Sequence, residues 1–409
     1  MLKEFNHTMV NRRAIVKWIL VLACMMTNIS QISFFVNTGL SSKVSTVIWA
    51  ALGAVSLLLS GMKIIIKRLY VFWLSALFLL FLGLNSIIYN LNYWSSTHIY
   101  SLFISLFVFL IGCILTRIMD KDFFRYLIWG YVISACIVAL EVYVRYFANG
   151  FNISSRIYVY DSKNSLAQIL LTAIVLLLFG ISAEEKRRHK LIIAIIIIGL
   201  FFLICIMKSR ASLVGFIIIY VVFLSNRKIK RRYKILSIIG VLTFFVILFN
   251  NNALYKLLVN DILFAGRNAR NIDDLTSGRV VLLSRAFQSI SVHLFEGIGS
   301  KYLDCFPIAV IMQFGLLPGL ILCVIAACPF IFAIKHIHDF KYNYSMVLVL
   351  LTVSSTYLVN GLFEALTPLG PGVKCYFLWL LYGVLKNQNT DSYCAKRLFG
   401  ESYESSGEC

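Results

Sequence analysis

Long apolar runs separated by short polar connections recur along this chain, and they constrain its fold more than any other feature. Hydrophobic residues make up 60% of the chain and charged residues 14%, with a mean hydropathy of +0.85, which is too apolar for a soluble domain. A helix of about 20 apolar residues spans the hydrocarbon core of a bilayer. The chain is therefore predicted to be an all-α polytopic membrane protein.

Twelve membrane spans are predicted, and the tenth is too long for one simple crossing. Pro307 and Pro318 divide the tenth into a short entry helix and the span proper. We divide the chain into spans one to nine (1–250), a large extracytoplasmic loop (251–304), spans ten to twelve (305–386) and a cytoplasmic tail (387–409). The spans are residues 15–36, 44–62, 69–89, 100–115, 126–146, 165–181, 191–207, 211–225, 235–249, 306–334, 346–362 and 373–385.

The net charge of +20 is distributed unevenly between alternate connections. With the N-terminus inside, the inner connections and termini hold 24 Lys and Arg residues and the outer connections hold 13, six of them in the long loop. Because basic residues concentrate on the cytoplasmic side, both termini are predicted to be cytoplasmic and the loop extracytoplasmic. The charge then reflects membrane topology, and no nucleic-acid partner is predicted. The inner connections are too short for a nucleotide-binding domain.

The loop at 251–304 is the longest polar interval, and its centre predicts a helix start. Thr276 or Ser277 is expected to cap a helix that opens at Gly278, which places Arg279 in the first turn. Free N–H groups and the helix dipole favour an anion there, so this turn is a candidate phosphate site, with Arg285 nearby. The alternative is a surface helix with solvated arginines.

Three smaller features fall on the same predicted side. Lys208 and Arg210 flank a tight connection between two spans, where they are placed to meet a lipid-linked phosphate or to act as interface anchors. Glu141 and Arg145 are four residues apart and are expected to pair on one helix face. The connection at 149–164 carries Arg156 among tyrosines, a composition that suits sugar binding or simple interface anchoring.

Neither the ten cysteines nor the six histidines show a metal-ligand spacing. Most cysteines fall within predicted spans, where they act as small hydrophobic residues. No metal and no cofactor is predicted.

Several short motifs resemble those of the O-antigen ligase and polymerase superfamily of bacterial membrane proteins. They are the Lys208-Ser209-Arg210-Ala211-Ser212 turn, the Asn164-Ser165-Leu166-Ala167 start of a span, Ser277-Gly278-Arg279 followed by an amphipathic helix ending at Phe295-Glu296-Gly297-Ile298-Gly299, and the segment 311–319. The order of the motifs and the long loop before the last spans also match. The resemblance covers roughly residues 164–385.

The resemblance implies an enzyme of the bacterial inner membrane that transfers a glycan from undecaprenyl diphosphate on the outer face. Arg210 and Arg279 would bind the diphosphate and stabilise the charge that grows on it. Lys208, Arg285, Arg156, Tyr302 and Asn164 are candidate substrate-binding residues. The implied partners are lipid-linked oligosaccharide, the bilayer, and chain-length regulator and flippase proteins.

One departure from the family pattern bears on the reaction. Ligases of the family carry a His-Asn motif before the tenth span, whereas this chain reads Ser300-Lys301-Tyr302-Leu303-Asp304. The missing histidine favours a polymerase of surface-polysaccharide repeat units over an O-antigen ligase acting on lipid A-core. Asp304 is the first candidate general base and Glu296 the second. Two other classes stay open: a lipid-linked glycan flippase or transporter, and a glycosyltransferase using polyprenyl-monophosphate sugars.

Overall fold

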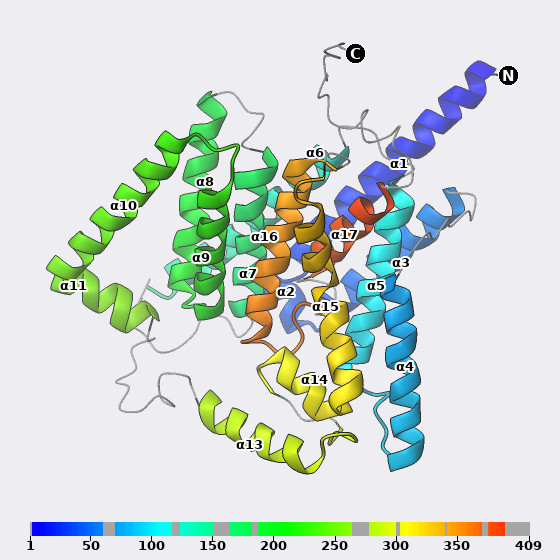
Figure 1. The fold of residues 1–409 in the computed structure, drawn as a ribbon. Coiled ribbons are helices and arrows are strands. Elements are labelled where there is room, and N and C mark those ends of the chain that lie inside the picture. The colour runs from blue at the N-terminus through cyan, green and yellow to red at the C-terminus, as the bar shows by residue number, and fades with distance from the viewer. Residues whose placement is uncertain are drawn as a thin grey trace, which may run out of the picture.

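The computed structural model describes residues 2–59, 70–116, 123–150, 163–181, 187–263, 278–299, 303–339, 342–369 and 375–388. These residues form helices joined by short connections, without a strand among them (Figure 1). The elements are α1 (Leu2–Ile29), α2 (Ser33–Asn37), α3 (Ser41–Leu59), α4 (Tyr70–Tyr89), α5 (Thr97–Leu115), α6 (Phe123–Ala148), α7 (Lys163–Val175), η1 (Leu176–Ile181), α8 (Arg187–Ile206), α9 (Arg210–Ser225), α10 (Arg231–Asn250), α11 (Asn252–Tyr255), η2 (Lys256–Leu263), α13 (Arg279–Val292), α14 (Phe306–Phe314), α15 (Leu316–His336), α16 (Tyr344–Gly361) and α17 (Tyr376–Gln388).

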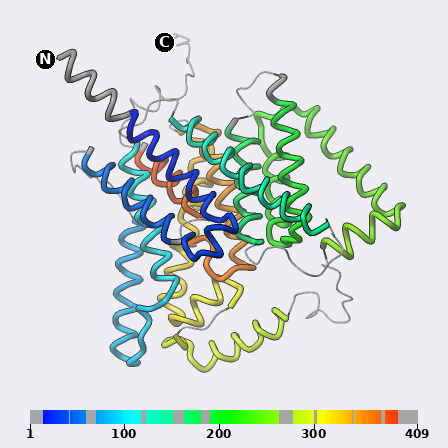
Figure 2. The backbone as a smooth tube through the Cα atoms, turned by 180° about the vertical axis from the view of Figure 1, so that it is seen from behind, coloured from blue at the N-terminus to red at the C-terminus, as the bar shows by residue number. Residues whose placement is uncertain are grey.

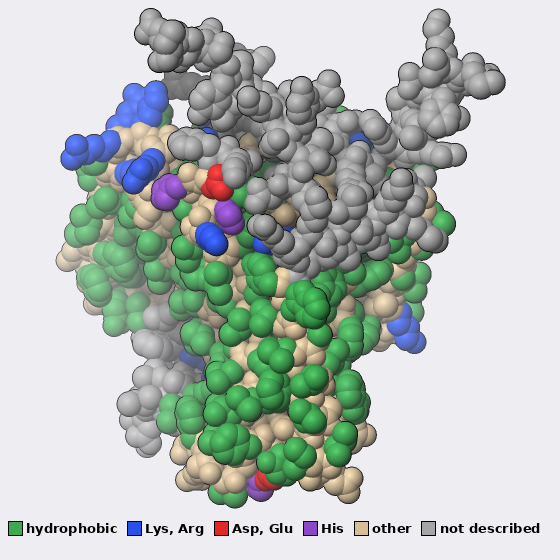
Figure 3. All heavy atoms as spheres, turned by 45° about the vertical axis from the view of Figure 1, so that its right-hand side comes forward, with side chains coloured by type: hydrophobic (Ala, Val, Ile, Leu, Met, Phe, Trp, Pro, Cys, Tyr) green, Lys and Arg blue, Asp and Glu red, His purple; other side chains and the backbone are tan. Residues whose placement is uncertain are grey.

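The described helices support the membrane class predicted from the apolar runs. Seven of them are long and apolar enough to cross a bilayer: α4, α5, α6, α7 with the start of η1, α10, α15 and α16. Four shorter apolar segments lie in α1, α3, α8 and α9. Hydrophobic side chains cover much of the middle of the face seen in Figure 3, while Lys and Arg side chains gather toward its upper end. The count of twelve spans stays a prediction.

The predicted division of the tenth span is confirmed. Pro307 lies in the first turn of α14, where its missing N–H costs no helical hydrogen bond. Gly315, with φ of 86°, separates α14 from α15. Leu316 N then donates to the carbonyl of Leu294, 2.8 Å away, so the break is attached to the end of the loop that precedes α14.

The ends of the helices define two faces of the bundle. The starts of α1, α8 and α10 lie at one end, which we call the N-terminal face, and α13 and α14 lie across the other end, which we call the α13 face (Figures 1 and 2). Asn85, near the end of α4, donates to the carbonyls of Phe295 and Phe314 at 2.9 and 3.1 Å. The loop segment before α14 is thereby held against the end of α4, one of the candidate membrane-spanning helices.

Two pairs of polar side chains join α7 and α16 in the bundle interior. Asn360 of α16 donates to Gln168 of α7 at 2.8 Å, and Thr172 lies 3.0 Å from the hydroxyl of Tyr357. All four residues are buried. Such pairs fix the relative rotation of α7 and α16, because an unpaired polar group in an apolar interior is costly.

The predicted pair between Glu141 and Arg145 is confirmed. Arg145 Nε lies 2.8 Å from Glu141 Oε1, one helical turn away on α6. The hydroxyl of Ser33 in α2 also donates to this carboxylate. The pair therefore joins α2 to α6.

Candidate functional site

The connection after α16, residues 362–369, brings three distant segments together on the α13 face. The carbonyl of Phe363 accepts a hydrogen bond from Arg279, and the carboxylate of Glu364 accepts one from Asn164. The next carbonyl, that of Ala365, lies 2.9 Å from Nε2 of His98 at the start of α5. This connection is the structural centre of the candidate site.

Arg279 is the first residue of α13, and its guanidinium is held on one side only. Its Nη2 donates to the carbonyl of Phe363 at 3.1 Å and lies 3.5 Å from Oδ2 of Asp304. The guanidinium carbon also lies 5.7 Å from the centre of the Phe363 ring. Among the described residues, Nε and Nη1 have no protein acceptor, so three N–H donors stay available to an anion.

Asn164 joins the 362–369 connection, which holds Arg279, to the α8–α9 turn. Its Nδ2 donates to Oε1 of Glu364 at 2.6 Å, and its Oδ1 accepts from the hydroxyl of Ser209 at 3.1 Å. Ser209 precedes Arg210, the first residue of α9, which is half-buried. A chain of contacts thus runs from Asp304 through Arg279, the 362–369 connection and Asn164 to the turn that carries Arg210.

Lys208 holds the α8–α9 turn in an uncommon backbone conformation. Its φ of 54° lies in the left-handed region, which non-glycine residues seldom adopt, and only 5% of its surface is exposed. Burial lowers the pKa of Lys208, and the nearby carboxylate of Asp261 in η2 opposes that shift. A buried cation at the end of a membrane helix is usually paired or functional.

Some of the predicted site residues that the structure describes contact one another, and others lie apart. Asp304 meets Arg279, and Asn164 meets the turn of Lys208 and Arg210. Glu296 instead binds His293, at the far end of α13. Because α13 has 14 residues, that end lies roughly 20 Å from Arg279.

Arg285 is also kept away from Arg279, although it lies on the same helix. Six residues of α-helix turn a side chain by about 240°, so Arg285 faces away from the buried stripe of Leu283, Ala286 and Ile290. Its side chain is exposed. Arg156 and Tyr302 lie outside the described residues.

The start of α13 differs from the predicted cap. The N-cap is Gly278, with φ of 77°, and no side chain caps the helix there. Glycine adopts this left-handed conformation without a steric penalty, which explains the Gly before Arg279. Thr276 and Ser277, the predicted caps, lie outside the described residues.

Two residues beside the candidate site, Glu364 and His98, were not predicted from the sequence as site residues. Glu364 is the only acidic residue between Asp339 and Asp391, and a carboxylate at the end of a membrane span is itself a signal of function or pairing. His98 lies 2.7 Å through Nδ1 from Gln313 and contacts Ala365 through Nε2. Both ring nitrogens of this buried histidine are occupied, which indicates a structural role.

No protein-family model matches this chain, and no curated protein matches it. Within the described part of the chain, no three His, Cys, Asp or Glu side chains are grouped so that they hold a metal ion. The site presents arginine, lysine and carboxylate groups near the end of several apolar helices, which suits binding of a phosphate attached to a lipid.

Proposed function

We propose that this chain is a membrane glycosyltransferase that polymerises lipid-linked repeat units of a surface polysaccharide, O-antigen or capsule. The donor is a growing glycan on undecaprenyl diphosphate, and the acceptor is the next lipid-linked unit. The reaction takes place on the outer face of a bacterial inner membrane, with both termini in the cytoplasm. One observation carries this proposal: Arg279 lies beside Asp304 and is linked through Glu364 and Asn164 to the turn of Arg210.

The residues of this cluster have distinct roles in the proposed reaction. A hydroxyl of the acceptor forms a bond to the anomeric carbon of the donor sugar while the bond from that carbon to the diphosphate breaks. The diphosphate leaves with the electron pair, and Arg279 and Arg210 stabilise the charge. The acceptor proton passes to the carboxylate of Asp304.

The contact between Arg279 and Asp304 supports two adjacent roles, with Arg279 binding the diphosphate and Asp304 accepting the proton. At 3.5 Å, the carboxylate is close enough to accept a proton next to a diphosphate held by the same arginine. Because Arg279 contacts both Phe363 and Asp304 through Nη2, its Nε and Nη1, which make no hydrogen bond to a described residue, are the proposed donors to phosphate oxygens. Asp304 therefore takes precedence over Glu296, which binds His293 instead.

Replacing the two arginines of α13 tests the site directly. Arg279→Ala should reduce polymer formation by about 100- to 1000-fold, the usual loss when one preorganised donor to a developing anion is removed. Arg285→Ala should leave polymer formation within about threefold, because its exposed side chain faces away from the cluster. Polymer length is measured on gels after reaction of purified enzyme with lipid-linked repeat units. An Arg279→Ala variant that retains activity as well as Arg285→Ala does would remove Arg279 from the site.

A strain that lacks the protein distinguishes polymerase from ligase. For a polymerase, we expect a single repeat unit to reach its normal acceptor, because ligation is done by another protein. Long carrier-linked chains would accumulate if the protein were the ligase. The measurement is the length of glycan on the acceptor and on extracted carrier lipid.

A further inference from the structure

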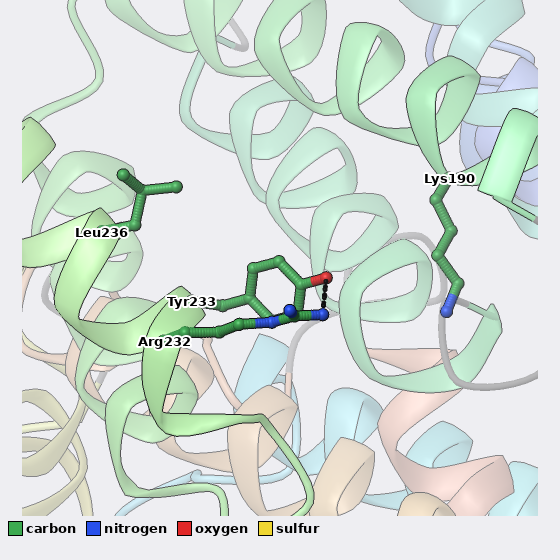
Figure 4. A pocket seen from close by; sticks show the side chains of 4 residues that line it. All are labelled: Lys190, Arg232, Tyr233 and Leu236. Carbon is green, nitrogen blue, oxygen red and sulfur yellow. Dashed lines mark hydrogen bonds between the residues drawn. The ribbon is translucent and has the colours of Figure 1, made fainter.

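A second cluster of basic residues lines a cavity on the N-terminal face, at the opposite end of α8 from the candidate site. The cavity has a volume of about 750 Å³ and is lined by Lys190 of α8 and by Arg232, Tyr233 and Leu236 of α10. Lys190 lies across the open space from Arg232 and Tyr233 (Figure 4). This volume is in the range of small-ligand pockets.

The two cations of the cavity have no carboxylate partner among the residues that the structure describes. Arg232 donates to the hydroxyl of Tyr233 at 3.1 Å and lies 4.9 Å from the centre of its ring. These contacts orient the guanidinium without neutralising it. The neighbouring chain adds to the positive potential, because residues 227–234 contain five further Lys and Arg besides Arg232 and no Asp or Glu.

Beyond the cavity, α8 and α10 expose many apolar side chains. Only Leu248 of α10 is buried, and the helix diverges from the rest of the bundle toward the α13 face (Figure 2). Its start is held to α9 by a contact of 3.4 Å between Ser237 and Tyr220. Leu236 and Leu242 of α10 and Ile195 and Ile198 of α8 are among the exposed apolar side chains on the two helices.

We propose that this cavity binds the headgroup of one anionic phospholipid, whose acyl chains lie along the exposed apolar surfaces of α8 and α10. Lys190 and Arg232 contact the phosphate, and the Tyr233 hydroxyl provides a further donor. A basic pocket between membrane helices at the level of the headgroups is the arrangement that recognises anionic lipids. This site is independent of the proposed glycan transfer, because it lies at the other end of the bundle.

Native mass spectrometry of the full chain tests the proposal. The purified protein is titrated with phosphatidylglycerol and, separately, with phosphatidylcholine of the same chains. We expect one tightly bound phosphatidylglycerol and no equivalent phosphatidylcholine. Lys190→Ala/Arg232→Ala should weaken phosphatidylglycerol binding by roughly 25-fold, because each cation at the headgroup level contributes about a factor of five. Lys190→Arg/Arg232→Lys should largely retain it.

Lys230→Ala/Lys335→Ala is the matched control, because it removes two exposed positive charges from the same face without touching the cavity. It should bind phosphatidylglycerol as the unmodified chain does. An equal loss in both double variants would show diffuse attraction and overturn the site. Equal binding of phosphatidylglycerol and phosphatidylcholine would overturn the site as well. Displacement of the lipid by equimolar glycerophosphoglycerol, which has the headgroup without chains, would show that the acyl chains add nothing and would overturn the phospholipid as the ligand. Size-exclusion profiles establish that each variant is folded.

Discussion

Asn164 illustrates how one side chain connects two of the short motifs. Its amide nitrogen donates to Glu364 and its amide oxygen accepts from Ser209, so both ends of the amide are used. The partners come from the 362–369 connection after α16 and from the α8–α9 turn. An amide is suited to this position because it offers a donor and an acceptor at once.

Replacing Asn164 by Asp should therefore destabilise the protein, although the two side chains are almost equal in size. Asn164→Asp places a second carboxylate against Glu364 and removes the donor, which should cost about 1–3 kcal/mol of stability. Glu364→Gln in the same chain restores a donor on the opposite partner and should recover most of the loss. Thermal unfolding of the single and double variants in detergent measures this coupling. Additive losses would mean that the two side chains do not interact.

At the scale of elements, the break between α14 and α15 determines how the loop joins the bundle. Gly315 has φ of 86° and ψ of 171°, a combination that is essentially restricted to glycine. A Cβ atom there would lie 2.0 Å from the carbonyl oxygen of Phe295. That carbonyl also accepts from Asn85 of α4, so it cannot move away without losing the contact.

Gly315→Ala should consequently destabilise the protein by at least about 1–3 kcal/mol from backbone strain alone, with the steric clash added to it. Gly240→Ala is the matched control, because Gly240 lies inside α10 with open space where its Cβ would be. That variant should be neutral or more stable by up to about 1 kcal/mol. The yield of folded protein and its melting temperature report both effects. A Gly315→Ala protein as stable as the unmodified chain would contradict the assigned geometry of the break.

At the scale of the whole molecule, the two faces carry different chemistry. The candidate glycan site lies on the α13 face, and the basic cavity lies on the N-terminal face. The distribution of basic residues predicts that the N-terminal face is cytoplasmic. The proposed reaction requires the α13 face to be outside, because the lipid-linked glycan is used there.

Reporter fusions test this orientation. Alkaline phosphatase fused after Lys256, in η2, should be active, because that enzyme folds only outside the cytoplasm. The same enzyme fused after Arg231, at the start of α10, should be inactive. The opposite pattern would exclude the proposed reaction at the Arg279 cluster and leave the fold unchanged. Immunoblotting of each fusion checks that equal amounts are compared.

Much of the local structure could be predicted from the sequence, because its signals are local. Apolar runs predict membrane helices, and Pro307 predicts the start of α14. The short polar interval around Ser209 predicts a tight turn between two helices. These features depend on residues within one or two helical turns of each other, so local sequence patterns are enough to predict them.

The grouping of the site residues was decided only by the tertiary structure. Asn164 and Glu364 are 200 residues apart, and no local pattern links them. Asp304, and not Glu296, contacts Arg279 because it lies where the chain returns to the bundle before α14. Arg285 lies apart from Arg279 because the two side chains point in different directions around the axis of α13. Membrane helices that are apolar on nearly every side carry little information about which neighbour they face. Packing and a few buried polar contacts determine the neighbours instead.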